Sequence, residues 1–265
     1  MRVVINADDF GMSHEKNIAI DKMMREGVCT NASLAVNMPW TKEAVQMSRA
    51  GGYTQKISLH INLTVGEALS ENIKRVSLYY NNGTFAYKPI IKKFRQIYPF
   101  HIKIIREEIE AQIETFLNFG LELRSLDSHN WVHLRIPVWL ALKPLLQKYD
   151  IKIVRPMWKG YKRPEIASRR WSRYFSIMEP FLLRCPQCRV FGHSSNIEQF
   201  LLEEKSLTKI DFTEVFTHPD LVNQKIIDIS SSYLRNPREE VTKNVAKMKK
   251  YLPITIEELL EEKKG

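Results

Sequence analysis

Apolar and polar positions along this chain follow two repeating patterns, which together predict alternating strands and helices. Short runs of β-branched and large apolar residues are typical of strands, whereas apolar residues recurring every three or four positions are typical of helices. Strands are expected at residues 2–7, 32–36, 56–63, 122–126, 151–154 and 214–217. Helices are expected at residues 13–27, 41–50, 102–120 and 171–183. This order predicts an α/β fold in which helices wrap a mainly parallel sheet or barrel.

Residues 64–100 break this alternation. They are rich in Asn, Gly, Tyr and Pro and have no clear period, so we interpret them as an insertion that lies over one face of the domain and shapes a substrate pocket. The length of 265 residues is typical of one α/β barrel, and no repeat, low-complexity tract or linker divides the sequence. We therefore expect a single domain over residues 1–265.

The charge of the chain raises the question of an anionic partner. The 40 Lys and Arg residues outnumber the 30 Asp and Glu residues, which gives a formal net charge of +10. Such an excess indicates nucleic-acid binding where the basic residues gather on one surface. Here they are scattered, and the densest late run, at residues 247–250, fits a solvated helix face. No nucleic-acid partner is expected.

The N-terminus and the cysteines bear on the compartment. Asp8 and Asp9 arrive before an apolar signal segment could form, and no apolar stretch approaches the ~18 residues needed to span a bilayer. We expect a cytoplasmic protein with no membrane partner. The three cysteines are no disulfide framework. Cys185 and Cys188 lack a second pair at zinc-site spacing, and Pro186 between them favours a loop or a helix-end turn.

Residues able to do chemistry follow the predicted strands rather than the helices. They are Asp8, Asp9, His60, Asp127, His129, Arg155 and His218. In an α/β barrel the carboxyl ends of the parallel strands converge on one mouth, so residues far apart in the sequence meet there. A shared site at this mouth is therefore expected.

The adjacent carboxylates suggest a division of labour. On extended backbone, Asp8 and Asp9 face opposite sides unless the chain turns, so one can bind a metal ion while the other acts on water as a general base. A carboxylate with two imidazoles suits a first-row divalent ion, although ligand type alone does not decide between zinc and other metals. His129 and His133 have the spacing of a pair on one helix face, if the segment is helical.

Three segments of the sequence resemble the YdjC-type carbohydrate deacetylases, whose best-known members act on chitooligosaccharides. These segments are Asn6-Ala-Asp-Asp-Phe-Gly11, His60-Ile-Asn-Leu-Thr64 and Asp127-Ser-His-Asn-Trp-Val-His133. Weaker similarities lie at residues 108–119, 154–156, 217–219 and 232–238. Because all of them occur in the family's order, the resemblance spans nearly the whole chain.

The resemblance implies a fold, a reaction and a set of residues. The fold is a distorted (β/α) TIM-like barrel, and the reaction removes the N-acetyl group from a short N-acetylated sugar, releasing acetate. The implied metal ligands are Asp9, His60 and His129. Magnesium is the implied ion, with zinc as a chemical alternative. Asp8 is implied as the base, His218 as a candidate general acid, and Arg155 as a candidate for orienting the base or the substrate.

The chain departs from the family at two places. A further histidine is usual where this chain has Trp131, and a glycine is usual at Asp220 or a neighbour. Trp131 could instead form a stacking wall for a sugar ring, and we expect His133 to contribute to substrate binding as well. These changes leave the implied metal ligands intact but leave the identity of the sugar open. A homodimer is possible, although the residue order locates no interface.

Two other functions fit parts of the sequence. A metal-dependent phosphoesterase could use the same ligands, but there is no Gly-rich phosphate-binding loop, and such enzymes more often bind two metals. A non-catalytic sugar-binding protein could present Trp131, Trp158 and Trp171 to sugar rings. Binding alone, however, gives no reason for a second carboxylate beside Asp9.

Overall fold

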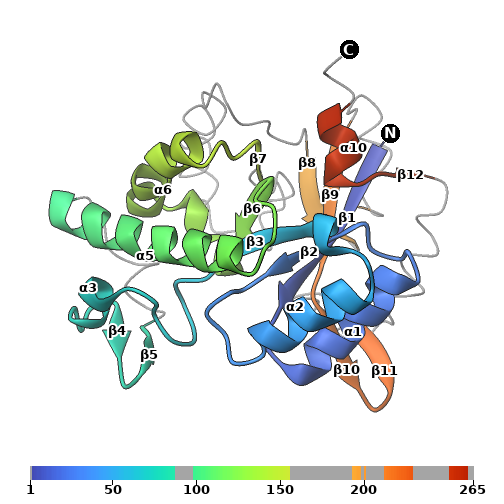
Figure 1. The fold of residues 1–265 in the computed structure, drawn as a ribbon, viewed down its shortest axis with the longest axis horizontal. Coiled ribbons are helices and arrows are strands. Elements are labelled where there is room, and N and C mark those ends of the chain that lie inside the picture. The colour runs from blue at the N-terminus through green and yellow to red at the C-terminus, as the bar shows by residue number, and fades with distance from the viewer. Residues whose placement is uncertain are drawn as a thin grey trace, which may run out of the picture.

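One parallel sheet forms the centre of the computed structural model (Figure 1). The structure describes residues 2–86, 98–155, 193–197, 200, 212–228 and 251–261. The strands of the sheet are β1 (Arg2–Phe10), β2 (Asn31–Leu34), β3 (Ile57–Ile61), β6 (Ser125–Ser128), β7 (Ile153–Val154), β8 (His193–Asn196), β9 (Phe212–Thr217) and β12 (Leu252–Pro253). They lie in the order β7-β6-β3-β2-β1-β9-β8, and β12 also pairs with β1. All of these pairs are parallel, so the α/β prediction is confirmed.

The strand order runs in both directions from β1. On one side β2, β3, β6 and β7 follow in chain order, and on the other side β9 and β8 complete the sheet. Among the described residues, β7 and β8 are therefore the two end strands of the sheet. The closed TIM-like barrel therefore stays a prediction, whereas the curled parallel sheet is observed.

Helices flank the sheet and pack against one another, with α1 beside β1 and β2 and α5 beside β3 and α6 (Figure 1). They are α1 (His14–Arg25), α2 (Thr41–Ala50), α3 (Glu71–Lys74), α5 (Pro99–Asn118), α6 (Ile136–Lys148) and α10 (Ile256–Glu261), with short 3₁₀ helices at Thr54–Lys56 and His129–Leu134. The hydroxyl of Ser13 caps α1 by accepting a hydrogen bond from the backbone N–H of Lys16, as the sequence predicts. In α5, Ile105, Ile109 and Ile113 are fully buried, as their helical spacing predicts.

Strands β1 and β6 extend further than predicted, and the extensions carry polar residues. β1 runs to Phe10 and so contains Asp8 and Asp9, and β6 contains Asp127. Asp9 has a positive φ of 73°, and the register between β1 and β2 shifts between Ala7 and Phe10. This local turn changes the alternation of side chains, so both carboxylates reach the interior at the end of the strand.

The predicted insertion begins with a compact segment. It consists of α3 and a hairpin of β4 (Tyr80–Asn81) and β5 (Thr84–Phe85). The buried carboxylate of Glu108 on α5 accepts hydrogen bonds from the backbone N–H groups of Leu69 and Ser70. Glu108 thereby ties the segment to α5, but its role in shaping a pocket stays a prediction. The predicted helix at 171–183 and the Cys185–Cys188 pair lie outside the described residues.

The C-terminal part contains elements that we did not predict. The strands β8 and β12 belong to the central sheet, and β10 (Pro219–Val222) and β11 (Lys225–Asp228) form an antiparallel hairpin that packs against α1. None of the helices in the described ranges is long and apolar enough to cross a membrane. The cytoplasmic location and the possible homodimer stay predictions.

Gly11 makes the turn out of β1 possible, so we expect Gly11→Ala to destabilise the fold. Its φ is +92°, and an added Cβ would lie 2.9 Å from the backbone oxygen of Ala35. Gly27 is a matched control, because its φ is also positive (+68°) but nothing lies within 4 Å of an added Cβ. We expect chemical denaturation to show a loss of about 1 kcal/mol for Gly27→Ala and about 3 kcal/mol for Gly11→Ala. Equal losses would mean that the contact with Ala35 does not matter.

Candidate active site

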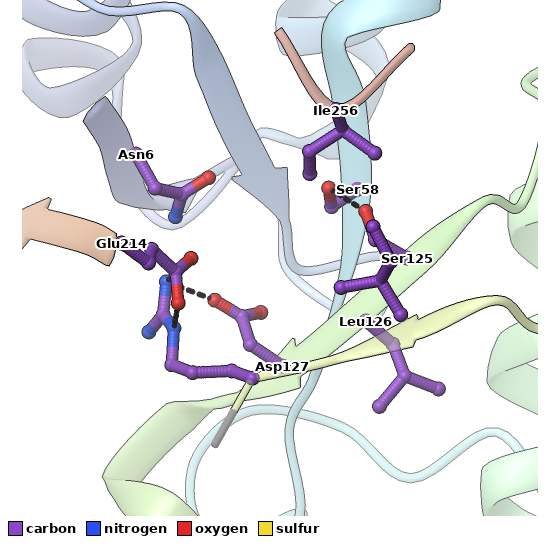
Figure 2. Close-up of a pocket in the computed structure, with 9 residues that line it drawn as sticks. Asn6, Ser58, Ser125, Leu126, Asp127, Glu214 and Ile256 are labelled. Atoms are coloured by element: carbon purple, nitrogen blue, oxygen red, sulfur yellow. Dashed lines mark hydrogen bonds and ion pairs between the residues drawn. The ribbon is translucent and has the colours of Figure 1, made fainter. Parts of the chain in front are cut away.

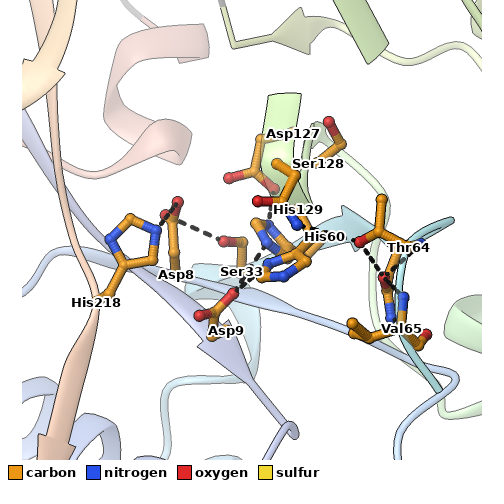
Figure 3. Close-up of polar contacts among 12 residues, drawn as sticks. Asp8, Asp9, Ser33, His60, Thr64, Val65, Asp127, Ser128, His129 and His218 are labelled. Carbon is orange, nitrogen blue, oxygen red and sulfur yellow. Dashed lines mark hydrogen bonds and ion pairs between the residues drawn. The ribbon is translucent and has the colours of Figure 1, made fainter. Parts of the chain in front are cut away.

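The carboxyl ends of the central strands bring the predicted site residues together (Figure 3). Asp8 and Asp9 come from β1, His60 from β3, His129 from the residue after β6, and His218 from the residue after β9. Arg155 directly follows β7. The side chains of Asp8 and Asp9 are 4% exposed, whereas those of His129 and His218 are 19% and 21% exposed. The site is therefore buried at the carboxylates and opens on the side of the two histidines.

Asp9, His60 and His129 form a group that could hold a metal ion. One potential ligand atom from each lies within 4.8 Å of the others. Oδ1 of Asp9 lies 2.9 Å from Nδ1 of His129 and 3.3 Å from Nε2 of His60. The buried Nε2 of His60 makes no hydrogen bond among the described residues, although it points at this carboxylate. An unsatisfied imidazole nitrogen beside a carboxylate and a second imidazole fits a divalent ion.

Asp127 orients His60 through the ring nitrogen that does not face Asp9. Its Oδ1 lies 2.7 Å from Nδ1 of His60, so it accepts a hydrogen bond from that nitrogen and leaves Nε2 to face Asp9. A carboxylate that accepts a hydrogen bond from the second nitrogen of an imidazole is the usual partner of a metal-binding histidine. The sequence predicts Asp127 as a member of the strand-end set and of a family-like segment, and this contact places it against His60.

The buried guanidinium of Arg155 contacts three carboxylates. Nη1 and Nη2 donate hydrogen bonds of 2.6 and 2.7 Å to the two oxygens of Asp8. Nε and Nη2 donate hydrogen bonds of 2.9 and 3.1 Å to the two oxygens of Glu214. Oδ2 of Asp127 lies 2.5 Å from Nη2. Figure 2 shows Glu214 and Asp127 converging from different strands beside a small cavity lined also by Asn6, Ser58 and Ser125.

Asp8 has three further polar neighbours besides Arg155. The amide of Asn6 and the hydroxyl of Ser33 donate hydrogen bonds of 2.6 and 3.5 Å to Oδ1, and Nε2 of His218 lies 3.6 Å from Oδ2. The other ring nitrogen of His218 is buried without a hydrogen-bond partner among the described residues. Oδ2 of Asp8 therefore lies between the guanidinium of Arg155 and a histidine at the open side of the site.

The charges of the buried groups are strongly coupled. Burial lowers the pKa of His60, but the charge and hydrogen bond of Asp127 raise it to about 10. Burial raises the pKa of Asp127, but Arg155 and His60 hold it at about 2. For Asp9, too, burial raises the pKa, but the hydrogen bond with His129 leaves it well below its usual range. Burial raises the pKa of Glu214 to about 7 even though Arg155 opposes the shift. Apart from Glu214, these groups are charged at neutral pH.

Comparison with known proteins identifies the family. Residues 2–248 match the family of YdjC-like proteins. The chain belongs to this family. A carbohydrate deacetylase of Oceanobacillus iheyensis is 29% identical over 244 residues, which cover 91% of this chain and 94% of that protein. A carbohydrate deacetylase of Vibrio cholerae is 33% identical over 241 residues, which cover 91% of this chain and 86% of that protein.

One solved structure shares the fold of this YdjC-like chain. It is that of a proposed cellobiose-phosphate cleavage protein from Enterococcus faecalis V583, with a TM-score of 0.69 and 20% sequence identity. The match covers 97% of this chain and 98% of that protein. At this level of identity the similarity shows that the two proteins share a fold, and it carries no conclusion about the reaction.

His129 and His133 do not share a helix face in this YdjC-like protein. Asn130 and Trp131 have positive φ values of 55° and 56°, which interrupt the short helix between the two histidines. His133 is fully buried, contacts the hydroxyl of Ser128 at 2.5 Å, and lies 3.1 Å from the carbonyl oxygen of Arg155 through Nε2. Burial lowers the pKa of His133 to about 4. Its described contacts are thus with protein, and the expected contact with substrate stays a prediction.

Trp131 lies beside the Arg155 cluster. Its ring packs edge to face against Phe216, with centroids 5.3 Å apart, and the guanidinium carbon of Arg155 lies 5.7 Å from the Trp131 centroid. Phe216 in turn packs against His218. These three rings form a continuous aromatic surface next to Asp8, which we call the aromatic wall. Whether Trp131 binds a sugar ring stays a prediction.

Two residues of the site were missed by the sequence analysis. Glu214 lies within a predicted strand. A charged residue directly before the apolar pair Val215 and Phe216 could have indicated a buried carboxylate with a polar partner. Lys16 is buried on α1 and lies 3.3 Å from Oδ2 of Asp9. A lysine on an amphipathic helix is usually solvated, so nothing in the sequence distinguished Lys16 from the other basic residues of the chain.

Proposed function

We propose that this chain is a metal-dependent hydrolase that removes the N-acetyl group from a short N-acetylated sugar such as a chitooligosaccharide. The observation that carries the proposal is the group of Asp9, His60 and His129 beside a second, separately held carboxylate, Asp8. Relatives that align with 91% of this chain are named carbohydrate deacetylases, which supports the same class of reaction.

Asp9, His60 and His129 are the proposed ligands of a divalent ion, with magnesium as the first candidate and zinc as the alternative. When bound, such an ion polarises the acetamide carbonyl and makes water a better nucleophile at neutral pH. Two imidazoles favour zinc over magnesium on chemical grounds, so the choice between these ions needs a direct measurement. The ligands must be deprotonated to bind, and the ion would take the place of the proton on Nε2 of His60.

Asp8 is the proposed general base. Its carboxylate is held by Arg155 and Asn6, and Oδ2 faces His218 at the more open side of the site. In the proposed reaction Asp8 accepts a proton from the attacking water, and Nε2 of His218 donates a proton to the departing amide nitrogen. The second transfer is needed because an amide nitrogen leaves poorly without protonation. The products are acetate and a free amino sugar.

The aromatic wall is the proposed surface for the sugar ring. Trp131 is half-buried, so it can offer part of its ring to a ligand, and Phe216 and Arg155 support it from behind. Stacking of a sugar on an aromatic face uses this kind of rigid, partly exposed side chain. Arg155 would act on the reaction by orienting Asp8, because its described hydrogen bonds are to buried carboxylates.

The site also bears on the phosphoesterase alternative. Asp8, His60 and Asp127 form a second group with metal-ligand geometry, as a two-metal enzyme would require. However, Asp8 and Asp127 of this group are already in contact with the guanidinium of Arg155. Because the positively charged guanidinium of Arg155 already neutralises these carboxylates, a second metal ion is disfavoured there, and this favours the deacetylase over a two-metal phosphoesterase.

The proposal can be tested by offering the purified protein two substrates. We expect acetate release from N,N′-diacetylchitobiose and no phosphate release from p-nitrophenyl phosphate, with magnesium or zinc present in both assays. Phosphate release without acetate release would favour the phosphoesterase instead. Binding of the sugar without either product would favour the non-catalytic alternative.

Asp127→Asn should weaken metal binding without removing a ligand. The amide cannot accept the hydrogen bond from Nδ1 of His60 with the same strength, so the orientation and basicity of His60 suffer. We expect zinc affinity, measured by isothermal titration calorimetry, to fall about 10- to 100-fold. Unchanged affinity in this variant would mean that His60 is not held for metal binding by Asp127.

A further inference from the structure

Arg155 connects the two sides of the open sheet. It follows β7, one end strand, while its partners Asp8 and Glu214 lie on β1 and β9, on the other side of the curl. Glu214 pairs in register with Val4 on β1, so it lies four residues before Asp8 along the sheet interior. The guanidinium thus bridges strands that are not neighbours, and its position depends on side chains rather than on backbone pairing.

The two edges of the guanidinium are used by two different carboxylates. Asp8 takes the edge formed by Nη1 and Nη2, and Glu214 takes the edge formed by Nε and Nη2. Paired hydrogen bonds fix the orientation of the planar guanidinium as well as its distance from each carboxylate. Glu214 is the hydrogen-bond acceptor of Nε, and its carboxylate is buried with the guanidinium.

A competing partner for Arg155 lies close by. Oδ2 of Asp127 is 2.5 Å from Nη2 but makes no hydrogen bond of good geometry. If the Nε edge lost its acceptor, rotation of the guanidinium toward Asp127 could satisfy this oxygen at the expense of Asp8. Such a rotation would loosen Asp8, because among its described hydrogen bonds only those from Asn6 (2.6 Å) and Ser33 (3.5 Å) to Oδ1 would remain.

We infer that Glu214 is a positioning residue for the deacetylation. It acts by fixing the orientation of the Arg155 guanidinium, so that the edge formed by Nη1 and Nη2 holds Asp8. This inference rests on the proposed function for its catalytic consequence. The placement of Arg155 by Glu214 does not depend on the reaction, so the two can be tested separately. Glu214 lines the small cavity beside the guanidinium and accepts hydrogen bonds from its Nε and Nη2.

Glu214→Gln is the informative variant because it keeps the size of the side chain. The amide oxygen can still accept from Nε, but the amide nitrogen then faces Nη2, where two donors oppose each other. Ser125→Ala is a matched control, since Ser125 lines the same cavity and bonds with Ser58 but has no described contact with Arg155. Glu214→Asp, which restores the charge with a shorter reach, serves as the conservative variant.

The first readout does not need substrate. In ¹⁵N-arginine-labelled protein, at a pH above about 7 where Glu214 is ionised, the Nε–H of Arg155 should be protected from solvent exchange. Its resonance can be assigned by its absence from Arg155→Lys. We expect exchange to be at least about tenfold faster in Glu214→Gln and unchanged in Ser125→Ala. Equal protection in Glu214→Gln and the unsubstituted protein would overturn the inference.

The second readout is kinetic, on folded and metal-loaded protein. We expect kcat for acetate release to fall about 10- to 100-fold in Glu214→Gln, with partial recovery in Glu214→Asp, while KM and metal content change by less than about twofold. A merely structural role would lower the unfolding temperature but leave kcat unchanged, and that result would overturn the inference. If the unsubstituted protein releases no acetate while the exchange result holds, the proposed function fails and the placement of Arg155 by Glu214 stands.

Discussion

Asp9→Asn is expected to lower kcat/KM for acetate release by about 1,000-fold or more, which corresponds to about 4 kcal/mol of transition-state stabilisation. Asn keeps the volume of Asp9 but removes the charge that faces both His60 and His129. Without the carboxylate, the two imidazoles alone make a weak site for a divalent ion. The metal content of the purified variant, measured by mass spectrometry, should fall together with the activity.

A matched control distinguishes the effect of losing the proposed metal ligand from the general effect of replacing an aspartate by asparagine. Asp21→Asn makes the same substitution on α1, where Asp21 pairs with Arg25 and Tyr53 away from the site. We expect Asp21→Asn to keep its metal and its kcat/KM. An Asp9→Asn protein that retains both metal and activity would remove the group of Asp9, His60 and His129 from the mechanism.

Arg155→Met is expected to lower the free energy of unfolding by about 3–5 kcal/mol. Met fills much of the volume, but Asp8, Asp127 and Glu214 would then be buried together without their shared cation. Removing one partner of a buried ionic cluster is costly because the remaining charges stay desolvated. Chemical denaturation, monitored by tryptophan fluorescence, measures the change.

The control for this prediction is an arginine in a solvated ion pair. Arg25 pairs with Asp21 one turn away on α1, and its side chain is 43% exposed. Because exposed pairs contribute little, Arg25→Met should leave the free energy of unfolding nearly unchanged. A similar stability for Arg155→Met and Arg25→Met would contradict the view that Arg155 holds the two sides of the sheet together.

The strands β1, β2 and β3 and the helices α1, α2 and α5 could be predicted because local patterns determine them. Ser13 caps α1 as expected, α2 matches its predicted range, and the isoleucines of α5 are buried. Strand ends were less predictable. β1 and β6 continue through Asp8, Asp9 and Asp127, since burial of these carboxylates depends on partners such as Arg155 that lie far away in the sequence.

The candidate site could be assembled from the sequence only in part. The strand-end pattern placed Asp9, His60 and His129 among the residues expected to meet, because parallel strands converge at one edge, and the family resemblance singled out these three as ligands. The pattern could not reveal that Glu214 bonds to Arg155, since β9 and β7 are not paired in the described sheet and these two residues meet through their side chains. It also could not reveal the break at Asn130 and Trp131, because these residues adopt the positive φ values that favour glycine, and no glycine marks the position in the sequence.

The most direct test of the proposed metal centre is acetate release from N,N′-diacetylchitobiose before chelation, after chelation, and after magnesium or zinc is added back. We predict that chelation abolishes release, that one of the two ions restores it in the unsubstituted protein, and that neither restores it in Asp9→Asn. Undiminished release after complete removal of metal, or full restoration in Asp9→Asn, would contradict the proposal that Asp9, His60 and His129 hold the ion required for deacetylation.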